Sequence, residues 1–220
     1  MKTKTPSRKT LPRHPLAAEP AAKLDLGRIF QAEYVAPRQP VLIDTTPGRY
    51  LAVEGTGAPG GAVFQARIGA LYSIAFTVKM TRTFSAQQDY TISKLEARYF
   101  NLCGAPLPPA EQWHWQLLLR TPDFVAVDEL ARAVTALRKR GKEGDASLVR
   151  LESIAEGRCV QMLHVGPYDK EGDTIAVMTQ LAAARGLRCA GPHHEIYISD
   201  PRRVPPAKLK TILRLPVVPI

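Results

Sequence analysis

Apolar residues along this chain form short runs typical of strands and wider spacings typical of one helix face. These patterns occur in the same order twice. In the first stretch, apolar runs at residues 41–43 and 50–53 predict strands. A break rich in glycine and proline follows at residues 55–61. The spacing of one helix face then appears at Phe64, Ile68, Leu71, Tyr72 and Ala75. Further strands are predicted at residues 90–100 and 113–119.

The second stretch repeats this order from about residue 157. A strand is predicted at residues 159–165, and Gly166 and Pro167 break it. A second helical stripe is formed by Ile175, Met178, Leu181 and Ala182. Gly186 stands where a helix of this length would end, and strands are predicted at residues 194–199 and 210–215.

Between these stretches lies one more helical pattern, marked by Val127, Leu130, Val134 and Leu137. Basic residues fill its last turn, where they suit the helix dipole, and Gly141 follows. The chain therefore predicts an α+β fold with a duplicated βαββ unit and a pseudo-two-fold axis. The expected halves are residues 41–122 and 157–220, with an antiparallel sheet, two main helices and an extra connecting helix.

Length and composition are those of a soluble globular chain. The 220 residues are 45% hydrophobic, and no apolar run approaches the ~20 residues that span a bilayer. The three cysteines, Cys103, Cys159 and Cys189, lie far apart without a CxxC pair, which favours a reducing compartment. No apolar segment of a secretory signal follows the basic N-terminus. We therefore expect a cytoplasmic protein.

Half of the net charge of +10 lies in residues 1–23. Six basic residues oppose one acidic residue there, which gives +5. This basic, proline-punctuated segment is typical of a disordered tail that associates weakly with phosphates. The folded domain is expected over residues 24–220. It shows no basic stripe and no nucleic-acid-binding module, so no specific nucleic-acid partner and no membrane partner are expected.

Six strings of this sequence carry a resemblance to a known family: HVGPYD at 164–169, HHEIYISDPRR at 193–203, KLKTILR at 208–214, ALYS at 70–73, WHW at 113–115 and TPDFV at 121–125. They resemble strings of standalone members of the GyrI-like family of small-molecule-binding proteins. The resemblance covers residues 23–220. It implies a ligand groove where two βαββ halves meet. Relatives are drug-sensing domains of multidrug regulators, a DNA gyrase inhibitor, and standalone proteins of which some hydrolyse cyclopropanoid DNA-alkylating compounds.

One segment departs from the family pattern. Where the subgroup has Leu-Glu-Gly before an aromatic pair, this chain reads LEARYF at 95–100. If Arg98 faced the groove, it would change the charge of the pocket and the range of ligands. No helix-turn-helix region precedes the domain, so a regulator would need a DNA-binding partner chain.

Two glutamates are the candidate catalytic groups. Strand alternation places Glu195, Tyr197 and Ser199 on one face of their strand and His194 on the other. Glu96 occupies the corresponding strand of the first half, so a pseudo-two-fold axis would bring Glu96 and Glu195 into one groove. Aromatic residues that could line this groove are Tyr72, Phe76, Tyr99, Trp113, Trp115, Tyr168 and Tyr197.

A carboxylate in such a pocket has two uses. It can pair with a flat cation that also contacts the aromatic rings. It can also act as a general base that takes a proton from water. In the second case Glu195 is the predicted base, Glu96 helps to hold the water, and Tyr197 or Tyr168 donates to the oxygen where negative charge develops.

Each of these assignments has a structural alternative. A glutamate on an antiparallel strand more commonly faces solvent, and Tyr72 and Phe76 at helical spacing more commonly belong to a core. Adjacent His193 and His194 point to opposite faces of a strand and cannot chelate one metal together, so no metal and no cofactor are expected. The function expected is binding of small hydrophobic, aromatic or cationic xenobiotics, with hydrolysis of cyclopropanoids as its more specific form.

Two functions from other classes stay open. The chain could be a non-enzymatic modulator that acts on a protein partner, as a gyrase inhibitor does, or a ligand-sensing partner of a transcription regulator. The sequence leaves the oligomeric state open, with a homodimer as one alternative.

Overall fold

A computed structural model of the chain describes residues 23–100 and 108–220. Within these residues the strands form one antiparallel sheet in the order β1-β6-β9-β8-β3-β4-β2-β5, with β7 paired to β9. The strands are β1 (Val41–Asp44), β2 (Gly48–Thr56), β3 (Leu95–Phe100), β4 (His114–Thr121), β5 (Arg150–Ile154), β6 (Arg158–Val165), β7 (Leu187–Cys189), β8 (His193–Tyr197) and β9 (Lys210–Pro219).

The longer helices are α3, α4 and α5. Their bounds, with those of the one-turn helices, are α1 (Leu26–Ile29), α2 (Gln31–Tyr34), α3 (Ala62–Phe84), α4 (Val127–Lys139), α5 (Glu171–Ala184), η1 (Ala110–Gln112), η2 (Gly144–Leu148), η3 (Tyr168–Lys170) and η4 (Pro206–Lys208). No described helix is long and apolar enough to cross a membrane.

The sheet order confirms the duplicated βαββ unit. The first unit is β2-α3-β3-β4 and the second is β6-α5-β8-β9. The innermost strands, β3 and β8, pair with each other, so that Ala97 lies opposite Glu195 at the centre. The strands β4 and β9 flank this pair, and β2 and β6 follow on the outside. The pseudo-two-fold axis therefore passes between β3 and β8.

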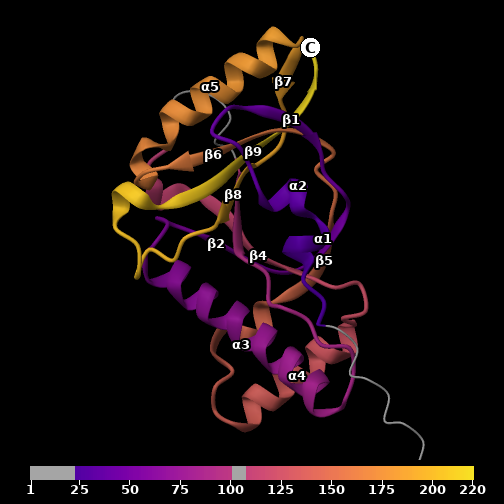
Figure 1. The fold of residues 1–220 in the computed structure, drawn as a ribbon. Helices are drawn as coiled ribbons and strands as arrows, with labels where there is room; N and C mark the ends of the chain where they lie inside the picture. The colour runs from indigo at the N-terminus through magenta and orange to yellow at the C-terminus, as the bar shows by residue number, and fades with distance from the viewer. Residues whose placement is uncertain (1–22, 101–107) are drawn as a thin grey trace, which may run out of the picture.

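The two main helices pack on the same face of the sheet but at its two ends. Figure 1 shows α5 beside β6 and β9, and α3 with α4 at the end formed by β2 and β4. Fully buried Leu71 and Ile74 of α3 join the core residues Leu117 and Leu119 of β4. Met178 of α5 packs in a second core cluster. Each fully buried side chain of this size contributes about 1.5–3 kcal/mol, which fixes both helices to the sheet.

The N-terminal helices α1 and α2 cover the opposite face of the sheet (Figure 1). They are held there by buried polar groups that reach both halves. In the first half, Arg120 of β4 donates to the Glu33 carboxylate at 2.8 Å. In the second half, Arg214 of β9 donates to the Glu33 backbone carbonyl at 2.8 Å. Residues 31–34 therefore join the two halves across the sheet.

His194 lies at the centre of this buried network. Its Nε2 is 3.0 Å from Glu96, and its Nδ1 is 2.9 Å from Glu156. Burial lowers the pKa of this imidazole, but Glu156 and Glu96 outweigh burial and raise the pKa above its ordinary value. Glu156 also pairs with Arg214 at 3.0 Å. Protonated His194 and Arg214 thus offset the carboxylates of Glu96 and Glu156.

Several predicted elements differ from the structure in their bounds. The strand predicted at residues 90–100 begins only at Leu95, because Tyr90 forms a bridge with Leu24 instead of entering the sheet. The short strands β5 and β7 were not predicted. The segment predicted to be a disordered tail, residues 1–23, lies outside the described residues except for Lys23, and so does Cys103.

Candidate functional site

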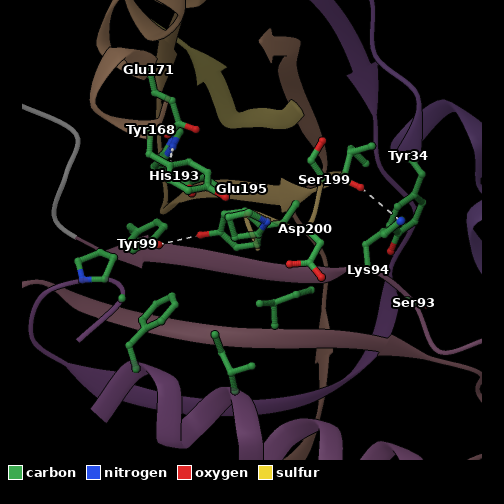
Figure 2. Close-up of a pocket in the computed structure, with 18 of the residues that line it drawn as sticks. Tyr34, Ser93, Lys94, Tyr99, Tyr168, Glu171, His193, Glu195, Ser199 and Asp200 are labelled. Atoms are coloured by element: carbon green, nitrogen blue, oxygen red, sulfur yellow. Dashed lines mark hydrogen bonds and ion pairs between the residues drawn. The ribbon is translucent and has the colours of Figure 1, made fainter. Parts of the chain in front are cut away.

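A large cavity lies between α3 and α5, above the central strands. Its volume is about 1780 Å³, well above the 300–1,000 Å³ of ordinary small-molecule pockets. The strands β3 and β8 supply its floor with Tyr99, His193, Glu195 and Tyr197. One wall comes from α3 and the other from α5. Figure 2 shows Tyr99, His193 and Glu195 converging between the two halves.

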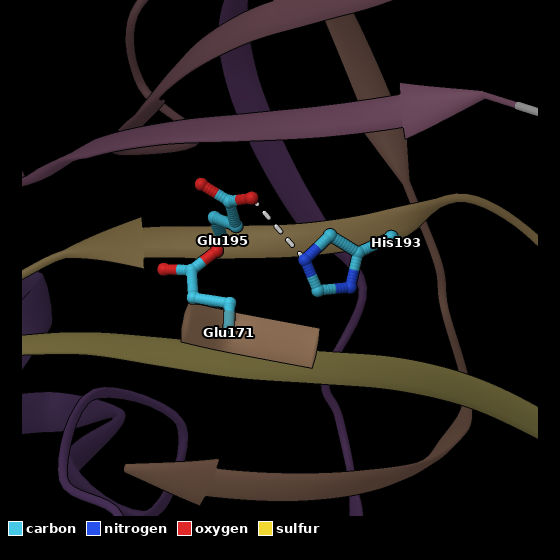
Figure 3. A group of neighbouring side chains, drawn as sticks. All are labelled: Glu171, His193 and Glu195. Carbon is cyan, nitrogen blue, oxygen red and sulfur yellow. Dashed lines mark hydrogen bonds and ion pairs between the residues drawn. The ribbon is translucent and has the colours of Figure 1, made fainter. Parts of the chain in front are cut away.

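Two carboxyl groups and an imidazole meet at one end of this floor. Glu195 Oε1 lies 3.2 Å from His193 Nε2. Glu171, the first residue of α5, points toward this pair (Figure 3). The possible ligand atoms of Glu171, His193 and Glu195 all lie within 4.8 Å of one another. All three residues are buried, with at most 8% of their surface exposed.

The Glu171 carboxyl holds a proton at neutral pH. Burial, followed by the neighbouring Glu195 carboxylate, raises the pKa of Glu171 to about 10. Two ionised carboxylates this close would repel each other in a poorly hydrated site. A proton on Glu171 removes this repulsion and lowers the negative charge of the pair. Such a site suits a singly charged organic cation, or a water molecule that is to lose a proton.

Glu171 is a site residue that the sequence reasoning missed. An acidic residue in the first turn of a helix is common because it interacts with the helix dipole, so its position gave no signal. Its distance from Glu195 depends on how α5 packs on β6 and β9. The one available clue was that Glu171 follows the string at 164–169 by two residues.

Phenol hydroxyls surround the carboxyl pair. The hydroxyls of Tyr99 and Tyr197 are hydrogen-bonded at 2.8 Å, and the Tyr168 ring meets the Tyr197 ring edge to face. Burial, and then Glu195, raise the pKa of both Tyr99 and Tyr197 well above its ordinary value. Both phenols therefore keep their protons and can donate hydrogen bonds across the physiological range.

The predicted aromatic residues divide between groove and core. Tyr72, Phe76 and Trp113 line the cavity, together with Tyr99, Tyr168 and Tyr197. Trp115 does not: its side chain is fully buried, and its indole N–H donates to the Gly57 carbonyl at 2.9 Å. The prediction that Trp115 lines the groove is wrong: the ring lies on the groove face of the sheet, opposite Tyr99, but α3 covers it there and Phe64 packs against it.

Glu96 lies on the opposite face of the sheet from Glu195. The register pairs Glu195 with Ala97, so Glu96 pairs with Ile196 and points away from the groove. Its side chain accepts from the Tyr34 hydroxyl at 2.6 Å and is fully buried. The expectation that the two glutamates face one groove is therefore wrong. The second carboxyl of the groove is Glu171.

Arg98 also points away from the groove. It donates to Gln116 Oε1 at 3.2 Å and lies over the Phe100 ring on the far face of the sheet. The departure from the family pattern at residues 95–100 consequently leaves the charge of the floor unchanged.

Comparison with known proteins identifies the class to which this fold and groove belong. A family model described as the GyrI-like small molecule binding domain matches residues 121–218. An uncharacterized conserved protein from Listeria innocua is 38% identical, with a TM-score of 0.83 over 89% of this chain and 100% of its own. A second structure, described as a hydrolase from Listeria innocua, is 36% identical, with a TM-score of 0.82 over 90% of this chain and 100% of its own.

A more distant likeness extends to a structure of low sequence identity. The EcmrR C-terminal domain is 14% identical, with a TM-score of 0.54 over 83% of this chain and 98% of its own, which shows a shared fold. A search of curated proteins found no match. The chain belongs to the GyrI-like family of small-molecule-binding proteins.

Proposed function

We propose that this protein binds small hydrophobic, aromatic or cationic xenobiotics in the groove and hydrolyses cyclopropanoid alkylating compounds there. The observation that carries this proposal is the buried pair Glu171 and Glu195, which holds one proton at the floor of an aromatic-walled cavity of about 1780 Å³. The similarity to a Listeria innocua protein described as a hydrolase supports turnover.

In the proposed reaction, Glu195 acts as the general base. It takes a proton from a water molecule while the water oxygen forms a bond to the cyclopropane CH₂ carbon. The ring C–C bond breaks, and its electron pair moves through the conjugated system to the carbonyl oxygen. Tyr197 or Tyr168 donates a proton to this oxygen, and the proton on Glu195 then restores the phenol.

Glu171 takes the part in this reaction that the sequence suggested for Glu96. Its protonated carboxyl can donate a hydrogen bond to the attacking water, since it lies beside Glu195. A neutral Glu171 also spares Glu195 the repulsion that a second carboxylate beside it would exert. Tyr99 supports Tyr197 by the hydrogen bond between their hydroxyls.

The test is incubation of the purified protein with a cyclopropanoid alkylator, with the ring-opened product followed by mass spectrometry. We expect product from the wild type, a loss of about 10²-fold or more in Glu195→Gln, and an unchanged rate in Glu111→Gln, an exposed glutamate outside the groove. Equal rates in the wild type and Glu195→Gln would overturn the role of Glu195.

Binding without product would remove the hydrolase and leave a ligand-binding protein. The two rival functions, a protein-interaction modulator and a ligand-sensing partner of a regulator, require no turnover. A modulator would also keep its effect in Glu195→Gln and lose it when exposed surfaces are changed.

A further inference from the structure

The cavity has a second charged end, remote from the carboxyl pair. It extends past the beginning of β3, where Lys94 and Ser199 line it, to Tyr34 (Figure 2). Lys94 lies one residue before β3 and reaches the chain just after β8, where its Nζ is 3.4 Å from the Ile198 carbonyl. At about 3.3 Å per residue, the three residues from Glu195 to Ile198 place this end roughly 10 Å from the carboxyl pair.

Lys94 is the cation at this end that has no carboxylate partner among the described residues. The other two basic residues of the cavity are already paired, Arg28 with Asp25 at 3.7 Å and Arg202 with Asp200 at 2.9 Å. Each of these two aspartates therefore already has a basic partner. The long contact to a backbone carbonyl leaves the ammonium free to donate further hydrogen bonds.

A neighbouring hydroxyl adds to the donor capacity of this end. Ser199 Oγ accepts a hydrogen bond from the Lys210 backbone N–H at 3.1 Å. Within the described part of the chain the Ser199 hydroxyl donates no hydrogen bond, so its proton is available to a ligand. The floor thus has acceptors and negative charge at Glu171 and Glu195, and donors and positive charge at Lys94 and Ser199.

We propose that Lys94, with Ser199, forms a second subsite that binds a carboxylate or carbonyl oxygen of an elongated ligand whose cationic or electrophilic end lies at Glu195. The inference rests on the proposed function of the groove and specifies its ligand. A rigid aromatic molecule with polar groups of opposite character about 10 Å apart would meet both ends at once.

Two matched probes test this proposal: 4′-amidinobiphenyl-4-carboxylate, and 4-amidinobiphenyl, which lacks the carboxylate. Their affinities are measured by calorimetry with the full-length wild type and with Lys94→Met, Lys208→Met and Glu195→Gln. Lys208→Met is the control, because Lys208 is exposed and does not line the cavity.

We expect the carboxylate probe to bind the wild type about 10-fold more tightly than 4-amidinobiphenyl does, which is the usual effect of one charge-assisted contact. Lys94→Met should abolish this difference, Lys208→Met should keep it, and added salt should reduce it. Glu195→Gln should weaken both probes alike.

The outcomes separate the two proposals. If both probes bind the wild type equally and Glu195→Gln weakens both, the Lys94 subsite is overturned and the groove remains the binding site. A preference that persists in Lys94→Met also overturns the subsite. If neither probe binds the wild type, the proposed binding of aromatic cations fails, and the subsite fails with it.

Discussion

The proton on Glu171 is the feature of a single residue that has the most direct consequence for stability. Its pKa of about 10 in the folded protein exceeds the ordinary value of a free carboxyl, because burial and Glu195 disfavour its ionised form. The folded state therefore binds more protons than the unfolded state between about pH 4.5 and pH 10. Stability attributable to this group is intact below this range and is lost as the pH rises through it.

Glu171→Gln should remove this loss. We expect the variant to gain stability relative to the wild type as the pH rises, by on the order of 1–3 kcal/mol between pH 5 and pH 8. Urea denaturation at both pH values measures the difference, with Glu111→Gln as the exposed control. A stability difference that is the same at pH 5 and pH 8 would contradict the protonated state of Glu171.

At the scale of elements, the close contact between β2 and β4 fixes Trp115 under α3. A Cβ atom added to Gly55 of β2 would lie 2.2 Å from the Trp115 ring, whereas one added to Gly69 of α3 would meet nothing within 4 Å. Gly55 is therefore required because a fully buried ring occupies the space beside it.

Alanine substitutions at the two glycines should have opposite effects. We expect Gly55→Ala to destabilise the protein by about 1–3 kcal/mol, since Trp115 must move within a packed core. Gly69→Ala should stabilise it by about 0.5–1 kcal/mol, because alanine is the better helix former. Thermal unfolding of both variants measures this. Equal melting temperatures for Gly55→Ala and the wild type would show that Trp115 is free to rearrange.

Elements were easier to predict than the site. The helical stripes and apolar runs identified α3, α4, α5 and most of the sheet, because the spacing of apolar residues in a helix or strand depends on which face is buried. Glu195 was recognisable from its strand and from the family strings. The position of Glu96 was mistaken because a shift of one residue in strand register reverses the face, and register is a property of the pair of strands.

At the scale of the whole molecule, the buried network opposite the groove joins the two halves. Arg214 contributes most to it, since it bonds to Glu156, Gln161 and the Glu33 carbonyl while only 1% of its surface is exposed. Removing one member of a buried ion pair leaves its partner uncompensated. The groove lies on the other face of the same strands, so its geometry depends on this network.

Arg214→Met should destabilise the protein by about 3–5 kcal/mol. Adding Glu156→Gln to this variant should cost less than Glu156→Gln costs alone, because the two side chains act as a pair. Denaturant unfolding of both single variants and the double variant measures the coupling. Arg132→Met, which breaks an exposed pair with Asp128, should cost far less than Arg214→Met, because solvent screens this pair. Additive costs for Arg214 and Glu156 would exclude the coupling.

The pairing of Ala97 with Glu195 across the pseudo-two-fold axis also has a consequence for ligand orientation. If both halves carried the same side chains at the axis, a ligand could bind equally well in either of two reversed orientations. Here one half supplies a carboxylate and the other a methyl group at the corresponding position. The two orientations are therefore unequal in energy, and a bound molecule should occupy the groove in a single direction.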